Sequence, residues 1–256
     1  MTRSILVLAA TLVLPLSVAA ESNIPFASGE KLGYEISMLG LRAATAELSI
    51  ERSGDGWRMF ASGRTVGATD SIFGLRQTAT CTVEGESLQP DLCRFDSRKR
   101  GGFSRKEVRF DRKTGLVRER SLDDAGKRKD RQHKFKDGLE DVQDALSGFY
   151  LLRRDLPGPG ETVSFRSMRK GKPIRVEAKY LGIEKIETEL GTFDAILVDL
   201  AIVTKVDKDA ATRAKVWFTQ DARRLPIRLS VAAPVGSLEA ELVRATGTVD
   251  PQLARR

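Results

Sequence analysis

Short segments in which apolar and polar residues alternate recur along most of this 256-residue chain. The alternation is clearest at residues 32–38, 44–51 and 191–198. It is typical of half-buried β-strands, whose side chains point to opposite faces in turn. Turn-forming residues, such as those at 53–56, separate the segments closely enough to favour antiparallel pairing. The sequence therefore predicts a mainly β fold, built as a single large curved antiparallel sheet or as a partly open barrel or sandwich.

One stretch departs from this pattern and shows helical spacing. Between residues 137 and 154, apolar residues recur at three- and four-residue steps and therefore share one face. Acidic residues lie early in the stretch, and Arg153 and Arg154 lie at its end, as the helix dipole favours. We expect one α-helix at about residues 137–154, covering the concave face of the sheet.

An incomplete fit between this helix and the sheet would leave an apolar cavity. Such cavities in barrels and half-barrels hold hydrophobic ligands. The candidate lining residues are Leu146, Phe149 and Tyr150 on the helix and Trp217 on a predicted strand. Close packing without a cavity is the alternative.

Residues 1–20 have the layout of a secretory signal peptide. Arg3 precedes an uncharged apolar run at residues 5–18, and small residues follow at the cleavage position. The apolar run is shorter than the roughly 20 residues of a membrane-spanning helix, and no later segment is apolar enough to span. We expect cleavage after about residue 20 and a location in the periplasm.

The rest of the chain shows no repeat of fixed period and no shift in composition that would mark a domain boundary. Its length is sufficient to bury a sizeable core. We expect a single β-rich domain at residues 21–247 and a flexible tail at residues 248–256.

The chain carries a formal net charge of +8. Exported basic proteins meet anionic envelope material, such as a lipid or an acidic polymer, more often than nucleic acid. The basic tracts at residues 98–100, 105–106 and 127–129 also lack the interleaved aromatic residues that stack on bases. We expect no nucleic-acid partner. Charged hairpin tips also protect sheet edges from pairing, so the tracts do not by themselves require a ligand.

Cys81 and Cys93 are the only two cysteines. A turn at residues 84–86 would place them on neighbouring antiparallel strands, and an even pair in an oxidising compartment favours a disulfide. A cross-link closing so short a loop stabilises a fold by about 3 kcal/mol. Two reduced, buried thiols are the alternative.

The residue types that carry catalysis are scarce. His133 is the single histidine and lies in a highly charged segment, and no nucleophile-elbow motif precedes a helix. One histidine and one cysteine pair also make a zinc site improbable, and no phosphate-binding glycine loop is present. We therefore expect no cofactor and no metal, and favour a non-enzymatic protein.

Asp141 and Asp144 lie three residues apart, so they can share a helix face. Two close carboxylates can carry out acid–base chemistry. Acidic residues are also what the first turn of a helix favours electrostatically. We interpret this pair as capping or surface residues.

Several stretches, in chain order, resemble an exported bacterial family called domain of unknown function 3108 (DUF3108). They are residues 25–34, with proline-phenylalanine and glycine-glutamate-lysine-leucine, residues 39–46, the aspartate-x-leucine-serine motif at 144–153, the glycine-threonine-phenylalanine hairpin at 187–195 and the tryptophan-x-threonine signature at 216–226. Together they span most of the chain after the signal peptide.

This resemblance implies a secreted, mainly antiparallel β protein with no established activity and no catalytic residues to transfer. Ala145 stands where the family pattern has proline. The general shape implied is similar to that of periplasmic lipoprotein carriers, in which a curved sheet and helices enclose an apolar cavity, an analogy at the level of fold only.

The leading hypothesis is non-enzymatic binding of an amphipathic or anionic envelope molecule under the helix. A structural or interaction module that contacts another cell-envelope protein is the alternative. A hydrolase is the third option, and it would have to use His133.

Overall fold

The computed structural model describes residues 24–169, 172–203, 212–232 and 236–249. Its strands are β1 (Glu30–Met38), β2 (Leu41–Ser53), β3 (Gly56–Thr65), β4 (Arg76–Glu84), β5 (Gln89–Lys99), β6 (Gly102–Asp111), β7 (Leu116–Asp123), β8 (Arg128–Lys134), β9 (Thr162–Arg169), β10 (Lys172–Thr188), β11 (Gly191–Val203), β12 (Thr212–Thr219), β13 (Pro226–Ala232) and β14 (Ser237–Thr246). The two helices among the described residues are α1 (Gly67–Phe73) and α2 (Ala145–Arg154).

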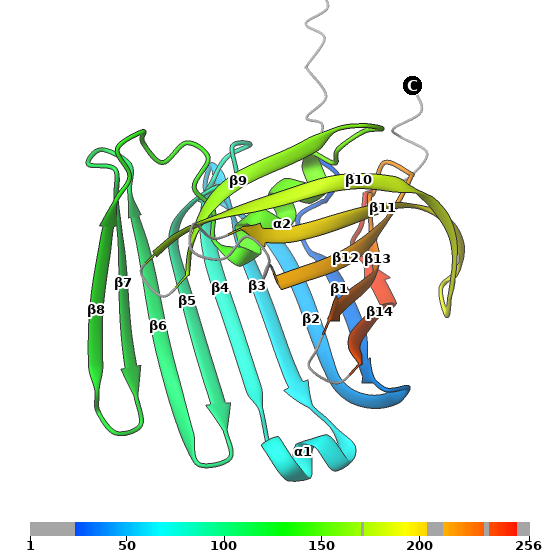
Figure 1. The fold of residues 1–256 in the computed structure, drawn as a ribbon, viewed down its shortest axis with the longest axis horizontal. Coiled ribbons are helices and arrows are strands. Elements are labelled where there is room, and N and C mark those ends of the chain that lie inside the picture. Colours follow the sequence, from blue (N-terminus) through cyan, green and yellow to red (C-terminus); the bar gives the residue numbers. More distant parts are fainter. Residues whose placement is uncertain (1–23, 170–171, 204–211, 233–235, 250–256) are drawn as a thin grey trace, which may run out of the picture.

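All fourteen strands belong to one sheet, in the order β8-β7-β6-β5-β4-β3-β2-β1-β14-β13-β12-β11-β10-β9. Each pair of neighbouring strands in this sheet is antiparallel. The chain thus forms two meanders, β1–β8 and β9–β14, joined where β1 pairs with β14 (Figure 1). This confirms the prediction of a mainly β fold with one large antiparallel sheet.

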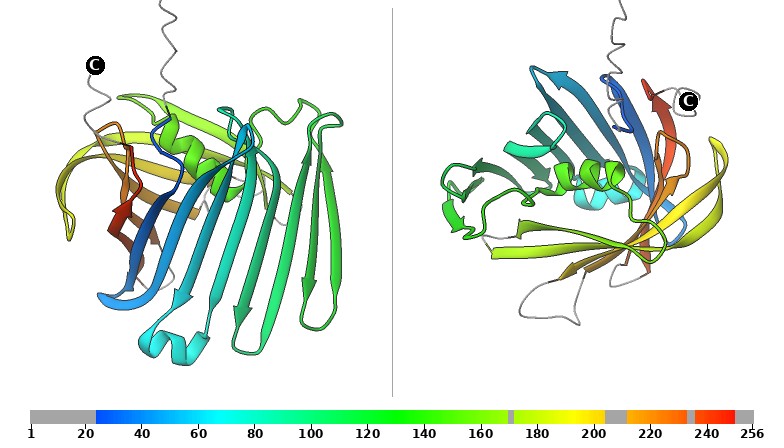
Figure 2. Two further views of the ribbon diagram at one scale, coloured as in Figure 1. Left: turned by 180° about the vertical axis from the view of Figure 1, so that it is seen from behind. Right: turned by 90° about the horizontal axis from the view of Figure 1, so that it is seen from above.

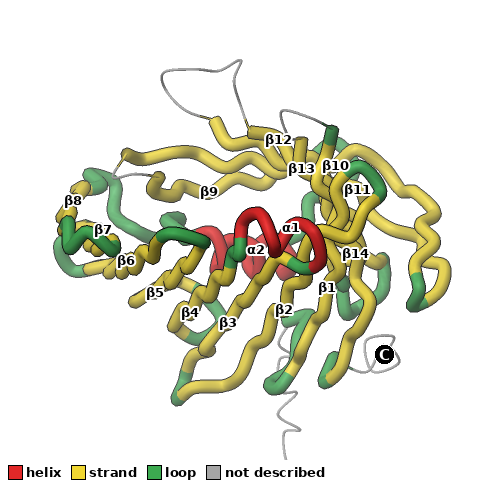
Figure 3. Tube along the Cα trace, turned by 90° about the horizontal axis from the view of Figure 1, so that it is seen from below, coloured by secondary structure: helices red, strands yellow, loops and turns green. Residues whose placement is uncertain are grey.

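The sheet curls so that the two meanders face each other as two walls. Seen from above in Figure 2 and from below in Figure 3, α2 lies between these walls. β8 and β9 are the two edge strands of the sheet, so the curl is not closed by pairing between them. The interior between the walls is therefore occupied chiefly by the side chains of α2 and of the inward-facing strand positions.

The predicted helix at residues 137–154 is wrong in its first part, because α2 spans only Ala145–Arg154. Gly138 has a left-handed φ of 78°, which a helix cannot contain. Val142 forms a parallel bridge with Arg166 on β9 instead of continuing a helix. The early apolar residues of this stretch, Leu139 and Val142, are buried as predicted, but in a segment of turns held against the edge of β9.

Arg153 anchors the C-terminal end of α2. Its guanidinium donates two hydrogen bonds to the Glu30 carboxylate, at 2.5 and 2.8 Å, and both side chains are completely buried. The remaining donors reach the backbone carbonyls of Pro25, Arg223 and Arg224 at 2.7–3.0 Å. One side chain thereby ties α2 to the start of β1, to the segment before it, and to the β12–β13 turn.

The predicted disulfide is confirmed, because Cys81 and Cys93 face each other across β4 and β5 and are bonded. The basic tract at residues 127–129 lies where the β7–β8 turn enters β8. No helix within the described ranges is long and apolar enough to cross a membrane.

Candidate functional site

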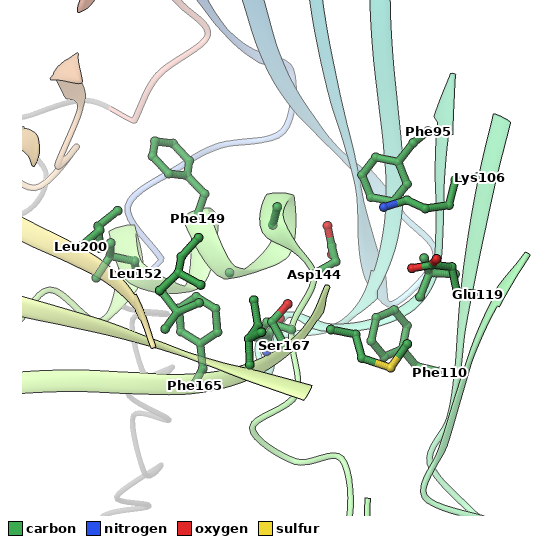
Figure 4. Close-up of a pocket in the computed structure, with 18 of the residues that line it drawn as sticks. Phe95, Lys106, Phe110, Glu119, Asp144, Phe149, Leu152, Phe165, Ser167 and Leu200 are labelled. Atoms are coloured by element: carbon green, nitrogen blue, oxygen red, sulfur yellow. The ribbon is translucent and has the colours of Figure 1, made fainter. Parts of the chain in front are cut away.

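A cavity of about 370 Å³ lies beside α2, between the two walls (Figure 4). Side chains from α2 and from strands of both walls line it. They are Phe95, Lys106, Val108, Phe110, Glu119, Gln143, Asp144, Ala145, Gly148, Phe149, Leu152, Phe165, Ser167, Met168, Ile174, Val176, Leu200, Ile202 and Ala214. Its volume falls within the range of about 300–1,000 Å³ that small-molecule sites occupy.

Most of the cavity wall is apolar. Phe149 and Leu152 project from α2, Phe165 from β9, and Leu200 from β11, as Figure 4 shows. Gly148 leaves room for the Phe165 ring, because a Cβ at that position would lie only 2.6 Å from the ring. The glycine thus lets α2 approach β9 closely while the space beside them stays open.

The polar lining residues gather where the cavity meets β6, β7 and the start of α2. Glu119 is buried and accepts a hydrogen bond from Arg131 at 2.7 Å, so its charge is paired. Lys106 extends over the Phe95 ring, with Nζ 4.2 Å from the ring centre. None of the ion pairs formed by the described residues involves Lys106. Its ammonium is therefore a cation at the cavity that forms no direct ion pair within the described part of the chain. Burial raises the pKa of the Asp144 carboxyl, and the charge of Lys106 opposes that rise.

Asp144 is the N-cap of α2. Its carboxylate accepts hydrogen bonds from the backbone N–H groups of Leu146 at 2.8 Å and Ser147 at 3.3 Å, and the Ser147 hydroxyl accepts from the Asp144 N–H at 3.2 Å. This reciprocal arrangement is a capping box, and it explains why the helix begins at residue 145. It confirms the interpretation of Asp144 as a capping residue.

The same carboxylate lies against the disulfide. Its Oδ2 atom is 2.9 Å from Cys81 Sγ and 3.1 Å from Cys93 Sγ. These three side chains are close enough to share a metal ion, but cysteine binds metal as a thiolate, and the two sulfurs are bonded to each other here. In the oxidised protein the group thus links the start of α2 to β4 and β5.

Burial raises the pKa of Asp144, although hydrogen bonds from Ser147 and Leu146 oppose the shift. The folded state therefore binds this proton more tightly than the unfolded chain does. Protonated Asp144 thus stabilises the folded state. This stabilisation is fully present below the ordinary aspartate pKa of about 3.9, and it is lost as the pH rises from there through the raised pKa of the folded state. Asn at this position keeps the cap and removes the charge.

We therefore expect Asp144→Asn to gain stability relative to the natural protein as the pH rises from about 4 to 7. Urea midpoints measured across this range would check it. Asp111→Asn is the matched control: hydrogen bonding from Thr114 lowers the pKa of the exposed Asp111, so its effect on stability changes below about pH 4 and its difference from the natural protein should stay nearly constant from about pH 4 to 7. A pH-independent difference between Asp144→Asn and the natural protein would contradict the expectation.

The structure distributes the four predicted lining residues over different places. Phe149 lines the cavity. Leu146 and Tyr150 pack into the core between α2 and the first wall. Trp217 belongs to a separate core cluster where the two walls join, and its Nε1 donates to Glu184 at 2.7 Å.

Sequence reasoning missed Lys106 and the residues of β9–β12 that complete the wall. Lys106 is two residues from Val108 and four from Phe110 on β6, so strand alternation places all three on one face. This alternation could be seen in the sequence, but the basic tract at residues 105–106 was interpreted as part of a solvated hairpin. No local signal could show which strands of the second wall would oppose it.

Two other candidates do not contribute to the cavity. His133 lies on edge strand β8, with its ring packed edge-to-face against Phe135. Nε of Arg166 donates to both carboxylate oxygens of Asp141, at 2.7 and 2.9 Å. This contact fastens the segment before α2 to β9. Neither residue is among those that line the cavity.

Comparisons with known proteins are consistent with this architecture. The family described as "Protein of unknown function (DUF3108)" matches residues 33–243. Sequence comparison with the curated proteins found no match.

Among solved structures, the chain is similar to a β-barrel-like protein of domain of unknown function DUF1849 from Brucella abortus. The TM-score is 0.55 at 11% identity, over 84% of this chain and 96% of that one. A protein from Parabacteroides distasonis, proposed to be a lipoprotein, aligns with a TM-score of 0.36 at 10% identity, over 88% and 98% of the two chains. The Brucella likeness supports the fold alone.

Proposed function

Since the chain belongs to the DUF3108 family, whose function is unknown, we propose that it is an exported protein that binds an amphipathic envelope molecule without transforming it. The apolar part of the ligand occupies the cavity beside α2, and an acidic group lies near Lys106. Export rests on the signal-peptide pattern of residues 1–20, which lie outside the described residues.

The observation that carries this proposal is the combination of an apolar cavity with one lining cation, Lys106, that forms no direct ion pair among the described residues. An apolar chain gains free energy by leaving water for such a cavity, at about 25 cal/mol per Å² of buried surface. A hydrogen bond to a charged group adds about 1.5–3 kcal/mol and fixes the orientation of the ligand. The same features offer no nucleophile and base at hydrogen-bonding distance, so they favour binding over hydrolysis.

The direct test is native mass spectrometry of the gently purified protein, followed by titration with dodecanoic acid as a probe. We expect one molecule of an amphipathic compound per chain, either co-purified or taken up. Val176→Trp fills the cavity from β10 and should weaken uptake about tenfold or more, because the added ring occupies the space of the ligand. Ile183→Trp, at an exposed position on the same strand, is the matched control.

Lys106→Met tests the proposed polar contact. It should weaken binding of dodecanoic acid roughly tenfold or more, and leave binding of the neutral dodecanol nearly unchanged, because only the acid loses a charged hydrogen bond. An empty protein that takes up neither probe would contradict the proposal. Specific crosslinking to one envelope protein in cells would then favour the interaction module instead.

A further inference from the structure

One end of the sheet gathers exposed apolar side chains. In an antiparallel meander alternate connections lie at the same end, so the β1–β2 turn, α1 and the β5–β6 turn come together there (Figure 1, bottom). Leu39, Leu41, Ile72 and Phe73 are 55–74% exposed at these connections. The exposed large apolar residues of this surface, called the apolar end below, are Met38, Leu39, Leu41, Ile72, Phe73, Phe103 and Leu238.

Backbone hydrogen bonds make the apolar end one continuous surface. The N–H of Arg100 in the β5–β6 turn donates to the carbonyl of Phe73 at the end of α1, at 2.9 Å. The N–H of Val66, just before α1, donates to Ala43 on β2 at 2.9 Å. The connections that carry the exposed residues are therefore held side by side, as the views in Figures 1 and 2 also show.

The α1 helix has no buried residue, so its apolar side chains do not serve the core. It is nevertheless held firmly in place. Asp70 accepts hydrogen bonds from Thr65 at 2.8 Å and from Arg76 at 2.5 Å, and Gly74 ends the helix in the left-handed conformation at φ 52°. Ile72 and Phe73 are thus presented to the surroundings on a fixed support.

Cations that form no ion pair with other described residues lie on one side of these apolar residues. Arg98, Lys99 and Arg100 lie at the β5–β6 turn, and Lys127 and Arg128 lie at the neighbouring β7–β8 turn. All five are exposed, and none belongs to the ion pairs formed by the described residues. The acidic residues of the same two turns are only Asp123 and Asp124, so the flank of the apolar end is positive.

We propose that the apolar end docks this protein onto an anionic lipid bilayer. The residues of the β1–β2 turn and α1 enter the boundary between head groups and acyl chains, and the basic residues at 98–100 and 127–128 lie against lipid phosphates. Apolar side chains combined with adjacent cations are what binding to an anionic membrane interface requires. The apolar side chains also protrude from turns and a short helix, which suits insertion into a soft surface better than a fit to a preformed protein groove.

This surface is separate from the cavity beside α2, so the inference does not depend on the proposed ligand. Vesicle co-sedimentation tests it, with the protein prepared as exported, cut after Ala20. Vesicles of phosphatidylethanolamine with phosphatidylglycerol should bind the protein, and vesicles of phosphatidylcholine alone should bind it weakly. Added salt should reduce the binding, because the charge attraction is screened.

The double variant Ile72→Asp with Phe73→Asp should reduce vesicle binding about tenfold or more, because it removes the inserted apolar groups and adds charge. Leu181→Asp with Ile183→Asp is the matched control, since both residues are similarly exposed on β10, outside the apolar end. Both variants should keep the urea midpoint of the natural protein. Equal losses of vesicle binding in both variants, or no loss in either, would overturn the proposal.

Tryptophan fluorescence can show whether α1 itself enters the membrane interface. The emission of Phe73→Trp should shift to the blue when phosphatidylglycerol vesicles are added, and brominated lipid should quench the tryptophan that has entered the interface. A shift absent in Phe73→Trp would refute insertion at α1. Loss of vesicle binding in all forms, together with capture of one envelope protein that the Ile72/Phe73 variant fails to capture, would assign this surface to a protein partner.

Discussion

Arg153→Ala is expected to lower the free energy of unfolding by about 3–5 kcal/mol, because it leaves the Glu30 carboxylate charged and buried without a partner. The substitution also removes the hydrogen bonds of the Arg153 side chain to the Pro25 carbonyl and to the β12–β13 turn. Among the described residues, it leaves only the bond from Arg224 to the Arg154 carbonyl between that turn and the end of α2. The two walls should then come apart more readily at the helix. Urea unfolding followed by tryptophan fluorescence would measure the effect.

The neighbouring residue provides the matched control. Arg154 follows Arg153 directly, pairs with Asp155 near the surface and donates a hydrogen bond to the Glu86 carbonyl, so Arg154→Ala should cost only about 1–2 kcal/mol. A double variant, Glu30→Leu with Arg153→Leu, should recover part of the loss, since an apolar pair avoids the cost of an isolated buried charge. If Arg153→Ala and Arg154→Ala unfold at the same urea concentration, the buried pair does not hold the fold together.

Removal of the disulfide is expected to have the second largest effect. Cys81→Ala with Cys93→Ala should lower the free energy of unfolding by about 3 kcal/mol, because the cross-link closes a short loop and restricts the unfolded chain. Both sulfurs are buried beneath the start of α2, so their loss also removes packing at the helix cap.

Treatment with a reducing agent distinguishes the contribution of the disulfide bond to stability from that of side-chain packing. It should lower the urea midpoint of the natural protein and leave that of the Cys81/Cys93 variant unchanged. Gln77→Ala with Ser97→Ala alters an exposed facing pair on the same two strands and should change stability by less than about 1 kcal/mol. Identical midpoints with and without reductant, after thiol labelling has verified full reduction, would contradict the expected role of the disulfide.

The sequence predicted the fold class because the signals for it are local. Alternation with period two marked the strands, and close turns marked antiparallel neighbours. The disulfide followed from the same logic, since a short turn between Cys81 and Cys93 places them in register. The helix was found from its apolar spacing, but its start was misplaced, because residues 137–144 are apolar on one face for a different reason: they lie against β9.

The candidate site was predictable only in part. Phe149 was identified from helical periodicity, and it lines the cavity. Leu146 and Tyr150 share the apolar character of α2 but point to the first wall, and the spacing of residues alone cannot say which wall a helix side chain meets. Lys106 was visible as a basic residue, yet only its position opposite α2 makes it part of the cavity.

By itself, the sequence determined the strand pattern, the antiparallel connections, the disulfide and the presence of an apolar-faced helix that ends near Arg154, since each depends on neighbours within a few residues. Only the tertiary structure decided where α2 begins, which strands enclose the cavity and why Arg153 is buried. From the sequence, Arg153 was interpreted only as a cation at the end of the helix, where the helix dipole favours positive charge. It is instead neutralised by Glu30, which lies 123 residues away in the sequence. Contacts between such distant residues depend on how the whole sheet curls, and no local pattern of the chain encodes that curl.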